Sequence, residues 1–334
     1  MSASELTAQP SQPSLGPERR PVRLLRRLLL NPPAVVGLCC LLLLLAGSAV
    51  NRNFLMPAYL LQQLQIAAFL GLAAAGLMAV ILLGHIDLSV PWTITTGAMM
   101  AAAAGAAFGP GWAIPAGLFC GALIGLVNGL GVAFLRIPSM IFTLGANAVL
   151  QGLMVLYTGG HAPQDAATPL MRDLAVGRTA GLPNAVLAWA AVSLLVYLLL
   201  TRTAAGRYVY VIGNSERAAY LSGVRTAAMT VACFVACGML AAFAGVMLAG
   251  YSGNAYQAMG DPYLLPAIAA VVLGGTNILG GRGSYLGTVA GVVFIVLLQS
   301  MLAVLQMPEA GRQIIYGALI LAMLMLYGRS AKVR

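Results

Sequence analysis

The chain has 334 residues, of which 60% are hydrophobic and 8% are charged, and its net charge is +10. An ordinary soluble domain is roughly a quarter charged, so this chain has too few charges to cover its surface with water-compatible groups. The composition excludes a soluble globular protein and predicts an all-α, polytopic membrane protein. The excess of positive charge fits the orientation of helices in a bilayer, so no nucleic-acid partner is expected.

Apolar stretches close to the roughly 20 residues that cross a bilayer as a helix recur along the chain. An even number of spans puts both termini on one side, and no length remains for a soluble domain. The prediction is a single transmembrane domain over residues 34–330, with some helices broken or re-entrant. About ten spans are expected, at residues 34–50, 57–83, 92–108, 112–134, 140–158, 184–201, 227–250, 264–279, 284–306 and 313–327.

Residues 1–33 are rich in Ser, Pro and Gln and then become basic from Arg19 to Arg27. This composition predicts a disordered, basic tail. Arginines before an apolar run can also open a cleavable signal peptide, for which Gly47, Ser48 and Ala49 offer a cleavage site. An uncleaved first helix explains the same pattern and is favoured.

The basic residues are unevenly divided between the two sides of the predicted bundle. Fourteen lie in the tail, at position 136, in the loop 202–226, at position 282 and at the C-terminal end, whereas the other side has four: Arg52, Arg172, Arg178 and Arg312. The positive-inside rule therefore places both termini and the loop 202–226 in the cytoplasm.

Glycines repeat every four residues in two of the predicted spans. Such spacing puts them on one ridge, where two helix backbones can approach closely, although a role in lining a path is an alternative. The predicted packing glycines are Gly117, Gly121, Gly125 and Gly129 in one span and Gly283, Gly287 and Gly291 in another.

The inventory of reactive residues disfavours an enzyme. Lys332 is the only lysine, so no phosphate-binding loop that ends in Lys-Ser or Lys-Thr exists, and His85 and His161 lie far apart. No catalytic residue, no metal site and no cofactor bound by this chain are predicted. Cys233 and Cys237 share a helix face without a His or acidic partner near them, so we interpret the five cysteines as small buried hydrophobic residues: Cys39, Cys40, Cys120, Cys233 and Cys237.

A carboxylate interrupts the apolar pattern at residues 84–91, between the second and third spans. Asp87 at membrane depth is costly, so it is a candidate for lining the solute path, together with Ser89. The alternative, which we favour, is that Asp87 caps or hinges the helix that starts near Ser89 and Pro91.

A polar stripe marks the fifth span, where Thr143, Asn147 and Gln151 recur every four residues. Uncharged hydroxyl and amide groups suit a neutral polyhydroxylated solute, and hydrogen bonds between helices explain the stripe equally well. Gln62 and Gln65 in the second span have the same two interpretations.

The loop 202–226 contains a predicted short helix. Asn214 or Ser215 can cap its start and Gly223 its end, with Tyr220 and Leu221 on its sides. A short helix outside the membrane is suited to docking on a partner, and the alternative is a solvated connector.

Glycines cluster again in residues 273–284, Leu-Gly-Gly-Thr-Asn-Ile-Leu-Gly-Gly-Arg-Gly-Ser. So many glycines predict non-helical backbone, which at membrane depth must be buried by protein or water. Gly274, Gly275, Thr276 and Asn277 are therefore candidates for a hinge or the path.

These segments, in this order and spacing, resemble the permeases of bacterial ABC sugar importers of the ribose, xylose, galactose and autoinducer-2 class. The matching motifs are residues 86–90, 136–138 with 143–145, 206–207 with 218–219 and 222–223, and 273–276 with 280–284. The resemblance covers roughly residues 55–310. His85 and Pro91 replace glycines of the family pattern, and Arg217 replaces an acidic residue, which bears on the choice of ATPase.

The resemblance implies a permease subunit of an importer that moves a monosaccharide or similar solute by alternating access. Its expected partners are a second permease subunit, identical or related, a cytoplasmic ATPase that holds the ATP and magnesium, a periplasmic sugar-binding protein and the lipid bilayer of the bacterial inner membrane. The loop that transmits ATPase closure would use Arg207, Gly213, Asn214, Glu216, Arg217, Ala218, Ala219, Leu221 and Gly223.

Two other classes remain as alternatives. An ion-coupled secondary transporter would use broken helices at mid-membrane and more than one buried carboxylate, whereas Asp87 stands nearly alone. A membrane-embedded enzyme lacks its catalytic residues. The identity of the solute is not fixed by the sequence.

Overall fold

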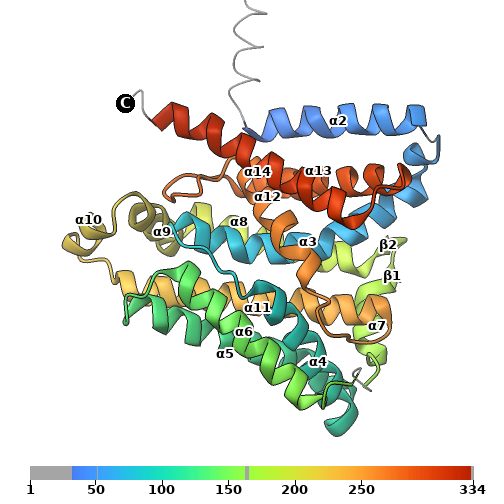
Figure 1. Ribbon diagram of the computed structural model, residues 1–334, viewed down its shortest axis with the longest axis horizontal. Coiled ribbons are helices and arrows are strands. Elements are labelled where there is room, and N and C mark those ends of the chain that lie inside the picture. Colours follow the sequence, from blue (N-terminus) through green and yellow to red (C-terminus); the bar gives the residue numbers. More distant parts are fainter. Residues whose placement is uncertain (1–31, 51, 162–164, 332–334) are drawn as a thin grey trace, which may run out of the picture.

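The computed structural model describes residues 32–50, 52–161 and 165–331, and it forms one bundle of helices (Figure 1). Residues 1–31 of the predicted basic tail lie outside the described residues. The longer helices are α2 (Pro32–Val50), α3 (Pro57–Leu82), α4 (Val90–Phe108), α5 (Ala113–Ala133), α6 (Ser139–Tyr157), α8 (Asn184–Arg202), α11 (Thr226–Ser252), α12 (Leu264–Leu273), α13 (Tyr285–Val304) and α14 (Glu309–Ala331).

Short elements connect these helices. They are the 3₁₀ turns η1 (Arg52–Leu55), η2 (Pro110–Trp112) and η3 (Asp261–Tyr263), the helices α7 (Pro169–Val176), α9 (Ala204–Asn214) and α10 (Glu216–Leu221), and the antiparallel pair β1 (Arg178–Thr179) and β2 (Leu182–Pro183). The sequence pattern did not predict α7, the strand pair or α9. The helix α7 and the strand pair are too short for hydrophobic periodicity to reveal them, whereas α9, with 11 residues, falls within the loop 202–226, for which only the helix after Ser215 was predicted.

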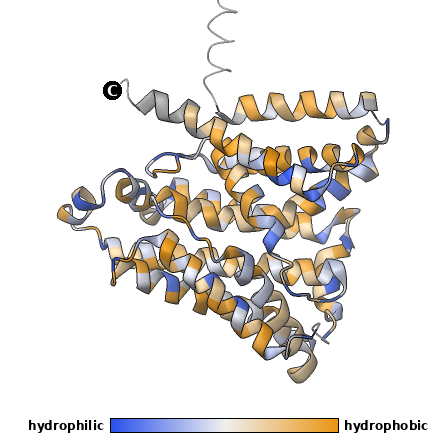
Figure 2. Cartoon of the chain, in the orientation of Figure 1, coloured by the Kyte–Doolittle hydropathy of each residue, from blue (hydrophilic) through white to orange (hydrophobic). Residues whose placement is uncertain are grey.

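Six helices are long and apolar enough to cross a membrane by length and composition, in the part of the chain that the structure describes. They span Pro57–Leu82, Pro110–Ala133, Ser139–Tyr157, Asn184–Arg202, Thr226–Ser252 and Tyr285–Val304. Figure 2 shows largely apolar helices, with hydrophilic residues concentrated in connections such as α9–α10 and β1–β2. The chain is thus a polytopic, α-helical membrane protein.

The bundle has two distinct ends (Figure 1). The α10 end carries α9, α10 and the connection between α12 and α13, and α14 ends there. The strand end carries α7, β1 and β2, and α3 begins there. Arg207, Arg217 and Arg282 lie at the α10 end, and Arg172 and Arg178 lie at the strand end.

Helix α11 forms the centre of the bundle, and α5 packs along it. The stripe Gly117, Gly121, Gly125 and Gly129 faces α11 so closely that a Cβ at Gly129 would lie 2.8 Å from the Cα of Val231. A methyl group here would displace the α11 backbone, since real Cβ atoms do not approach so near. Close approach gains dispersion contacts that lipid chains would not supply.

The second glycine stripe lies between α12 and α13. A Cβ at Gly287 or Gly291 of α13 would overlap the carbonyl oxygen of Gly274 or Ala270, respectively, and a Cβ at Gly283 would lie 2.7 Å from the hydroxyl of Thr276. The stripe therefore brings α13 against α12 and against the start of the segment that follows α12.

Helix α12 is shorter than expected. The sequence pattern predicted a span over residues 264–279, whereas α12 ends at Leu273. Gly275, with φ +88°, has a backbone conformation that continues no helix. The prediction of non-helical backbone within residues 273–284 describes this region better than the prediction of a span to residue 279.

The starts of α4 and of η3 meet inside the bundle. The backbone N–H of Gly260, just before η3, donates to the hydroxyl of Thr95 in α4 at 3.2 Å, and Gly260 packs on the carbonyl of Pro91. Thr95 itself donates to that Pro91 carbonyl at 3.0 Å. Two chain segments more than 160 residues apart thus begin their helices against each other.

Candidate functional site

The first interruption of the helices is residues 83–89, between α3 and α4. The Asp87 carboxylate accepts the backbone N–H of Ser89 at 2.9 Å and the Ser89 hydroxyl at 2.6 Å, and only 1% of Asp87 is exposed. A bond from a carboxylate to the N–H two residues on forms a local turn, which here directs the chain into α4. Asp87 therefore holds the turn that leads into α4 and makes no cap bond to the helix itself, and its contact with a solute stays a prediction.

Two further helices complete the surroundings of Asp87. Asn128 of α5 donates its amide to the Ser89 hydroxyl at 2.7 Å, and the thiol of Cys237 in α11 lies beside the Asp87 carboxylate. The expectation that no acidic group lies near the cysteine pair is therefore wrong. The interruption brings Asp87 to Cys237 from 150 residues away, which spacing along one helix could not reveal.

The polar stripe of α6 runs along the first interruption. Thr143 accepts the backbone N–H of Leu88 at 2.9 Å, and the amide oxygen of Asn147 accepts the N–H of Trp92 at 3.4 Å. Ser139, one turn earlier, accepts the N–H of Ile86 at 3.2 Å. In this structure the stripe supplies the hydrogen bonds that a helix would otherwise give to these N–H groups.

The sequence analysis missed Ser139 because the residue directly follows Pro138 and was placed before the span. Its four-residue spacing from Thr143 is the signal that would have found it. Gln151, at the far end of the stripe, is exposed.

The two glutamines proposed for the second span differ in their surroundings. Gln65 is buried and donates to the carbonyl of Ala175 in α7 at 2.7 Å, whereas Gln62 is exposed. Gln65 therefore connects α3 to the α7 segment at the strand end.

The second interruption is residues 274–284, between α12 and α13. It is held mainly by its own backbone: the N–H of Asn277 donates to the carbonyl of Arg282 at 2.8 Å, and the N–H of Gly280 donates to the carbonyl of Asn277 at 2.9 Å. Gly280 and Gly281 have φ values of +88° and +75°, which side chains rarely permit. The prediction of a glycine-dependent, non-helical turn is confirmed for its backbone.

The two interruptions touch each other at the α10 end. The N–H of Gly281 donates to the carbonyl of Leu82, the last residue of α3, at 2.9 Å. A Cβ at Gly84 would lie 3.2 Å from the carbonyl oxygen of Leu279. A displacement of one interruption must therefore displace the other.

Helix α9 ends against this contact. The Asn214 amide donates to the carbonyl of Gly281 at 3.0 Å, and Gly213 packs on the carbonyl of Leu82 and on the backbone N of Gly281. We name Leu82, Gly213, Asn214 and Gly281 the junction. It joins α3, the second interruption and α9 in one backbone contact.

A second bond beside the junction comes from α9. Tyr210 donates its hydroxyl to the carbonyl of Gly283 at 3.2 Å. The sequence analysis assigned Gly213 and Asn214 to a loop and did not predict that α9 contacts the second interruption at all.

Helix α10 follows directly after the junction. Ser215 caps it by accepting the N–H of Ala218 at 3.3 Å, and Gly223, with φ +81°, follows its end, as predicted. Tyr220 is 69% and Leu221 is 77% exposed, whereas Ala219 is buried. Among the other residues proposed for this loop, Arg207, Glu216, Arg217 and Ala218 are exposed.

An ionisable pair links α10 to the first interruption. His85 lies at the α10 end beside Gly84, which is exposed. Burial lowers the pKa of His85 from its ordinary value of 6.5, and the Glu216 carboxylate of α10 opposes that shift. His85 is therefore neutral at pH 7, because burial disfavours the charged form more strongly than Glu216 favours it.

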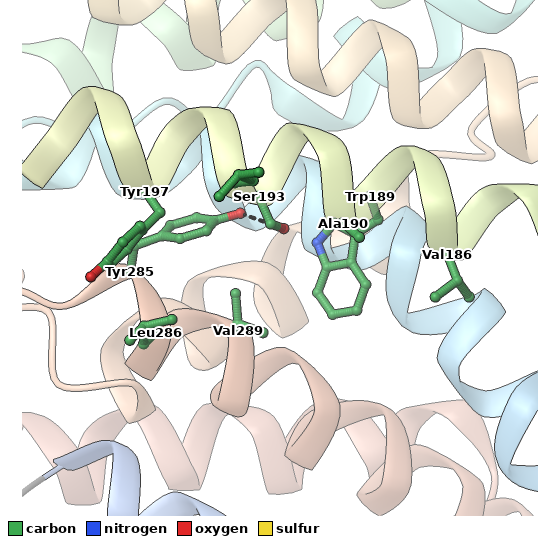
Figure 3. Close-up of a pocket in the computed structure, with 9 residues that line it drawn as sticks. Val186, Trp189, Ala190, Ser193, Tyr197, Tyr285, Leu286 and Val289 are labelled. Carbon is green, nitrogen blue, oxygen red and sulfur yellow. Dashed lines mark hydrogen bonds between the residues drawn. The ribbon is translucent and has the colours of Figure 1, made fainter. Parts of the chain in front are cut away.

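A groove of about 360 Å³ lies between α8 and α13 (Figure 3). Its lining is mostly apolar, and of the few polar side chains there the Tyr285 hydroxyl donates to Ser193 at 2.9 Å, while the side chains of Trp189, Tyr197 and Val289 close around the groove. The groove offers little hydrogen bonding to a polyhydroxylated solute. It is a poor candidate for the path.

An all-helical bundle with apolar outer faces and two interrupted helix junctions defines a polytopic membrane transport protein. The chain belongs to the family described as "Branched-chain amino acid transport system / permease component", whose model matches residues 59–324. It is a permease component.

Relatives of this chain share about a third of its sequence over the aligned residues. The ribose import permease protein RbsC of Escherichia coli (strain K12) is 34% identical over 278 residues, which cover 82% of this chain and 87% of that protein. The autoinducer 2 import system permease protein LsrC of Escherichia coli (strain SMS-3-5 / SECEC) is 34% identical over 286 residues, which cover 84% and 82%. No solved structure matches the chain.

Proposed function

We propose that this chain is the permease subunit of an ATP-binding cassette importer in a bacterial inner membrane, and that it passes a monosaccharide or similar polyhydroxylated solute. The relatives named above import ribose and autoinducer 2, which supports this class of solute. The ten helices α2 to α6, α8 and α11 to α14 would be the spans, with α12 as a broken one, and the α10 end, with both termini, would face the cytoplasm.

The partners follow from that proposal. A separate cytoplasmic ATPase would hold the ATP and magnesium, a periplasmic binding protein would deliver the solute at the strand end, and a second permease subunit would complete the transporter. This chain would supply no catalytic group and bind no cofactor of its own.

The observation that carries the proposal is the position of α10 next to the junction. Tyr220 and Leu221 of α10 expose apolar surface outside the predicted spans, which suits a partner's groove. Asn214, just before α10, bonds to the second interruption, and Gly213 packs on Leu82 of α3. A push on α10 would therefore reach both interruptions by direct contact.

Alternating access needs two arrangements of the helices that ATP and the binding protein bias differently. The interruptions are suited to this, because a bend there breaks few intrahelical hydrogen bonds. The proposed motion is a rocking of α4 and α12 about residues 83–89 and 274–284.

Reconstitution into proteoliposomes tests the proposal, with the separate ATPase and the secreted binding protein that it requires. ATP-dependent uptake of radiolabelled D-ribose, D-xylose or erythritol is expected, and none is expected from the permease alone. Uptake driven by an ion gradient without the ATPase would overturn the proposal in favour of a secondary transporter.

The coupling role of α10 has its own test. Tyr220→Ser with Leu221→Ser, Gly223→Val, or replacement of residues 216–219 by unrelated sequence should leave membrane insertion intact and abolish ATP-coupled uptake. The matched control is Leu195→Ala in α8, which is 57% exposed in the middle of its helix, away from α10 and from the strand end, and should keep full uptake. Normal uptake in all α10 variants would remove the assignment.

A further inference from the structure

A second cavity, of about 500 Å³, opens between α3, α13 and α14, away from both interruptions. Its lining differs from that of the α8–α13 groove because six of its residues are polar: Tyr59, Gln63, Gln299, Ser300, Gln306 and Arg312. We name it the glutamine cavity. Its volume lies in the range of small-molecule sites.

The glutamine cavity lies toward the strand end of the bundle. Gln63 is six residues after the start of α3, which places it roughly 9 Å inside the helix, and Gln299 is five residues before the end of α13, roughly 7–8 Å inside. The cavity therefore extends into the bundle from the strand end, which is the side that the proposed function assigns to the binding protein.

Hydrogen-bonding capacity remains free in this cavity. Tyr59 and Ser300 bond to each other through their hydroxyls, and the Gln299 amide lies beside the Tyr316 hydroxyl, but within the described residues no side-chain hydrogen bond engages the amides of Gln63 or Gln306. An amide in the apolar part of a membrane is unfavourable unless a partner satisfies it. If these amides paired directly with one another across the helices, their side chains would fill the cavity. In the structure the cavity stays open.

The charge of the cavity selects the class of ligand. Arg312 is its one charged lining residue, and the Glu309 carboxylate lies 3.6 Å from the guanidinium. The Arg312 Nε also donates to the carbonyl of Met307 at 3.2 Å. Because Glu309 offsets the positive charge, the cavity favours a neutral ligand with many hydroxyl groups over an anion.

We infer that the glutamine cavity binds the transported solute, a neutral polyol or monosaccharide, after it enters from the strand end, with Gln63 and Gln299 as hydrogen-bonding residues and Tyr59 as an aromatic wall. This inference rests on the proposed function. It places solute contact at two amides that the sequence pattern did not single out, since they form no regular stripe on one helix.

The decisive experiment measures solute delivered per ATP hydrolysed in the reconstituted transporter, with D-ribose, D-xylose and erythritol as probes. Gln63→Leu and Gln299→Leu should lower that ratio about tenfold for the probe that the wild type carries best, because a solute hydroxyl loses its partner. ATP hydrolysis and the amount of inserted protein should stay unchanged.

Gln313→Leu is the matched control. Gln313 is exposed at the start of α14, beside Arg312 but outside the cavity lining, so its replacement should leave the ratio unchanged. Arg312→Gln should change the ratio less than about threefold for a neutral probe, since the charge of Arg312 is already offset.

The outcomes separate this inference from the proposed function. If the wild type shows no ATP-driven uptake of any probe, the proposed function fails. If the wild type transports and Gln63→Leu and Gln299→Leu keep the wild-type ratio, the glutamine cavity is not the solute site although the function stands. Uptake of ribose 5-phosphate in preference to ribose would overturn the assignment of a neutral ligand to the cavity.

Discussion

Residues 83–89 and residues 274–284 both leave helical geometry inside an apolar bundle, but different groups satisfy their backbones. In the first interruption, N–H groups bond to side chains of α6 and to Asp87. In the second, N–H groups bond mostly to backbone carbonyls, and glycines adopt positive φ. A chain can leave helical geometry inside a membrane protein in two ways: polar side chains can accept hydrogen bonds from its backbone N–H groups, or a glycine-rich turn can form hydrogen bonds within its own backbone.

This difference makes different substitutions harmful in each interruption. The first interruption should be sensitive to substitutions that remove a polar side-chain atom. The second should be sensitive to substitutions that add a side chain to one of its glycines. The junction belongs to the second type, since Gly213 and Gly281 allow backbone to meet backbone.

The largest effect is expected from Gly213→Ala. A Cβ at this position would overlap the carbonyl oxygen of Leu82 and lie 2.5 Å from the N of Gly281, so the junction would have to open. We expect a destabilisation of about 3 kcal/mol and loss of uptake. Thermal unfolding in detergent measures it, with Gly152→Ala of α6 as the control, because that glycine has open space around it. Equal unfolding temperatures for both variants would contradict the steric account.

Asp87→Leu is expected to have the next largest effect. It leaves the N–H and hydroxyl of Ser89 without their acceptor at a fully buried position, which costs about 2 kcal/mol. Asp87→Asn keeps an oxygen for the Ser89 N–H and should lose less. The unfolding temperatures of the two variants are compared, and a larger loss in Asp87→Asn would argue against the turn that Asp87 forms with Ser89.

Thr143→Val tests the hydrogen bonds from α6 to the first interruption, because valine has almost the same shape as threonine. The backbone N–H of Leu88 loses its acceptor, and we expect a loss of about 1–2 kcal/mol. Thr201→Val is the control, because the Thr201 hydroxyl is exposed and bonds only to the carbonyl of Tyr197 in its own helix. If the two variants lost equally little stability, the side-chain hydrogen bonds from α6 would not hold the first interruption.

Asn214→Ala should cost less, about 1 kcal/mol, because the backbone holds most of the second interruption without it. The measurement is the same unfolding series. A loss greater than that of Thr143→Val would reverse the comparison between the two interruptions.

The smallest effect is the pH dependence at His85. Because burial lowers its pKa below the ordinary 6.5, the folded protein binds this proton less readily than the unfolded chain does. Its contribution to stability is complete above pH 6.5 and declines as the pH falls below that value. Unfolding temperatures between pH 7.5 and pH 5.5 should decline more in the wild type than in His85→Asn, and identical slopes would contradict the assignment.

Much of the bundle could be predicted from the sequence, because helix length and hydrophobicity are local properties. The predicted span 184–201 and helix α8 (184–202) differ by one residue, and α3 and α6 agree equally closely. The short helix after Ser215 was also predicted, because its cap and its terminal glycine are local signals. The tail was predicted from composition alone and lies outside the described residues.

The partners of the polar residues could not be predicted in the same way. The stripe Thr143 and Asn147 had two open interpretations, since spacing shows which residues share a face but not what that face meets. The contact of Cys237 with Asp87 and the bond of Asn214 to Gly281 join segments far apart in the chain. The glutamine cavity is likewise formed by α3, α13 and α14 together.

The sequence by itself determined that this protein is a membrane protein, roughly where most of its long helices lie, and which glycine ridges can pack closely. These follow from hydrophobicity, helix length and the missing Cβ, all of which act within one segment. Only the tertiary structure decided which backbone groups each polar side chain satisfies and where helices leave an open polar space. That outcome depends on how helix faces are rotated against one another, and packing over the whole bundle sets those rotations.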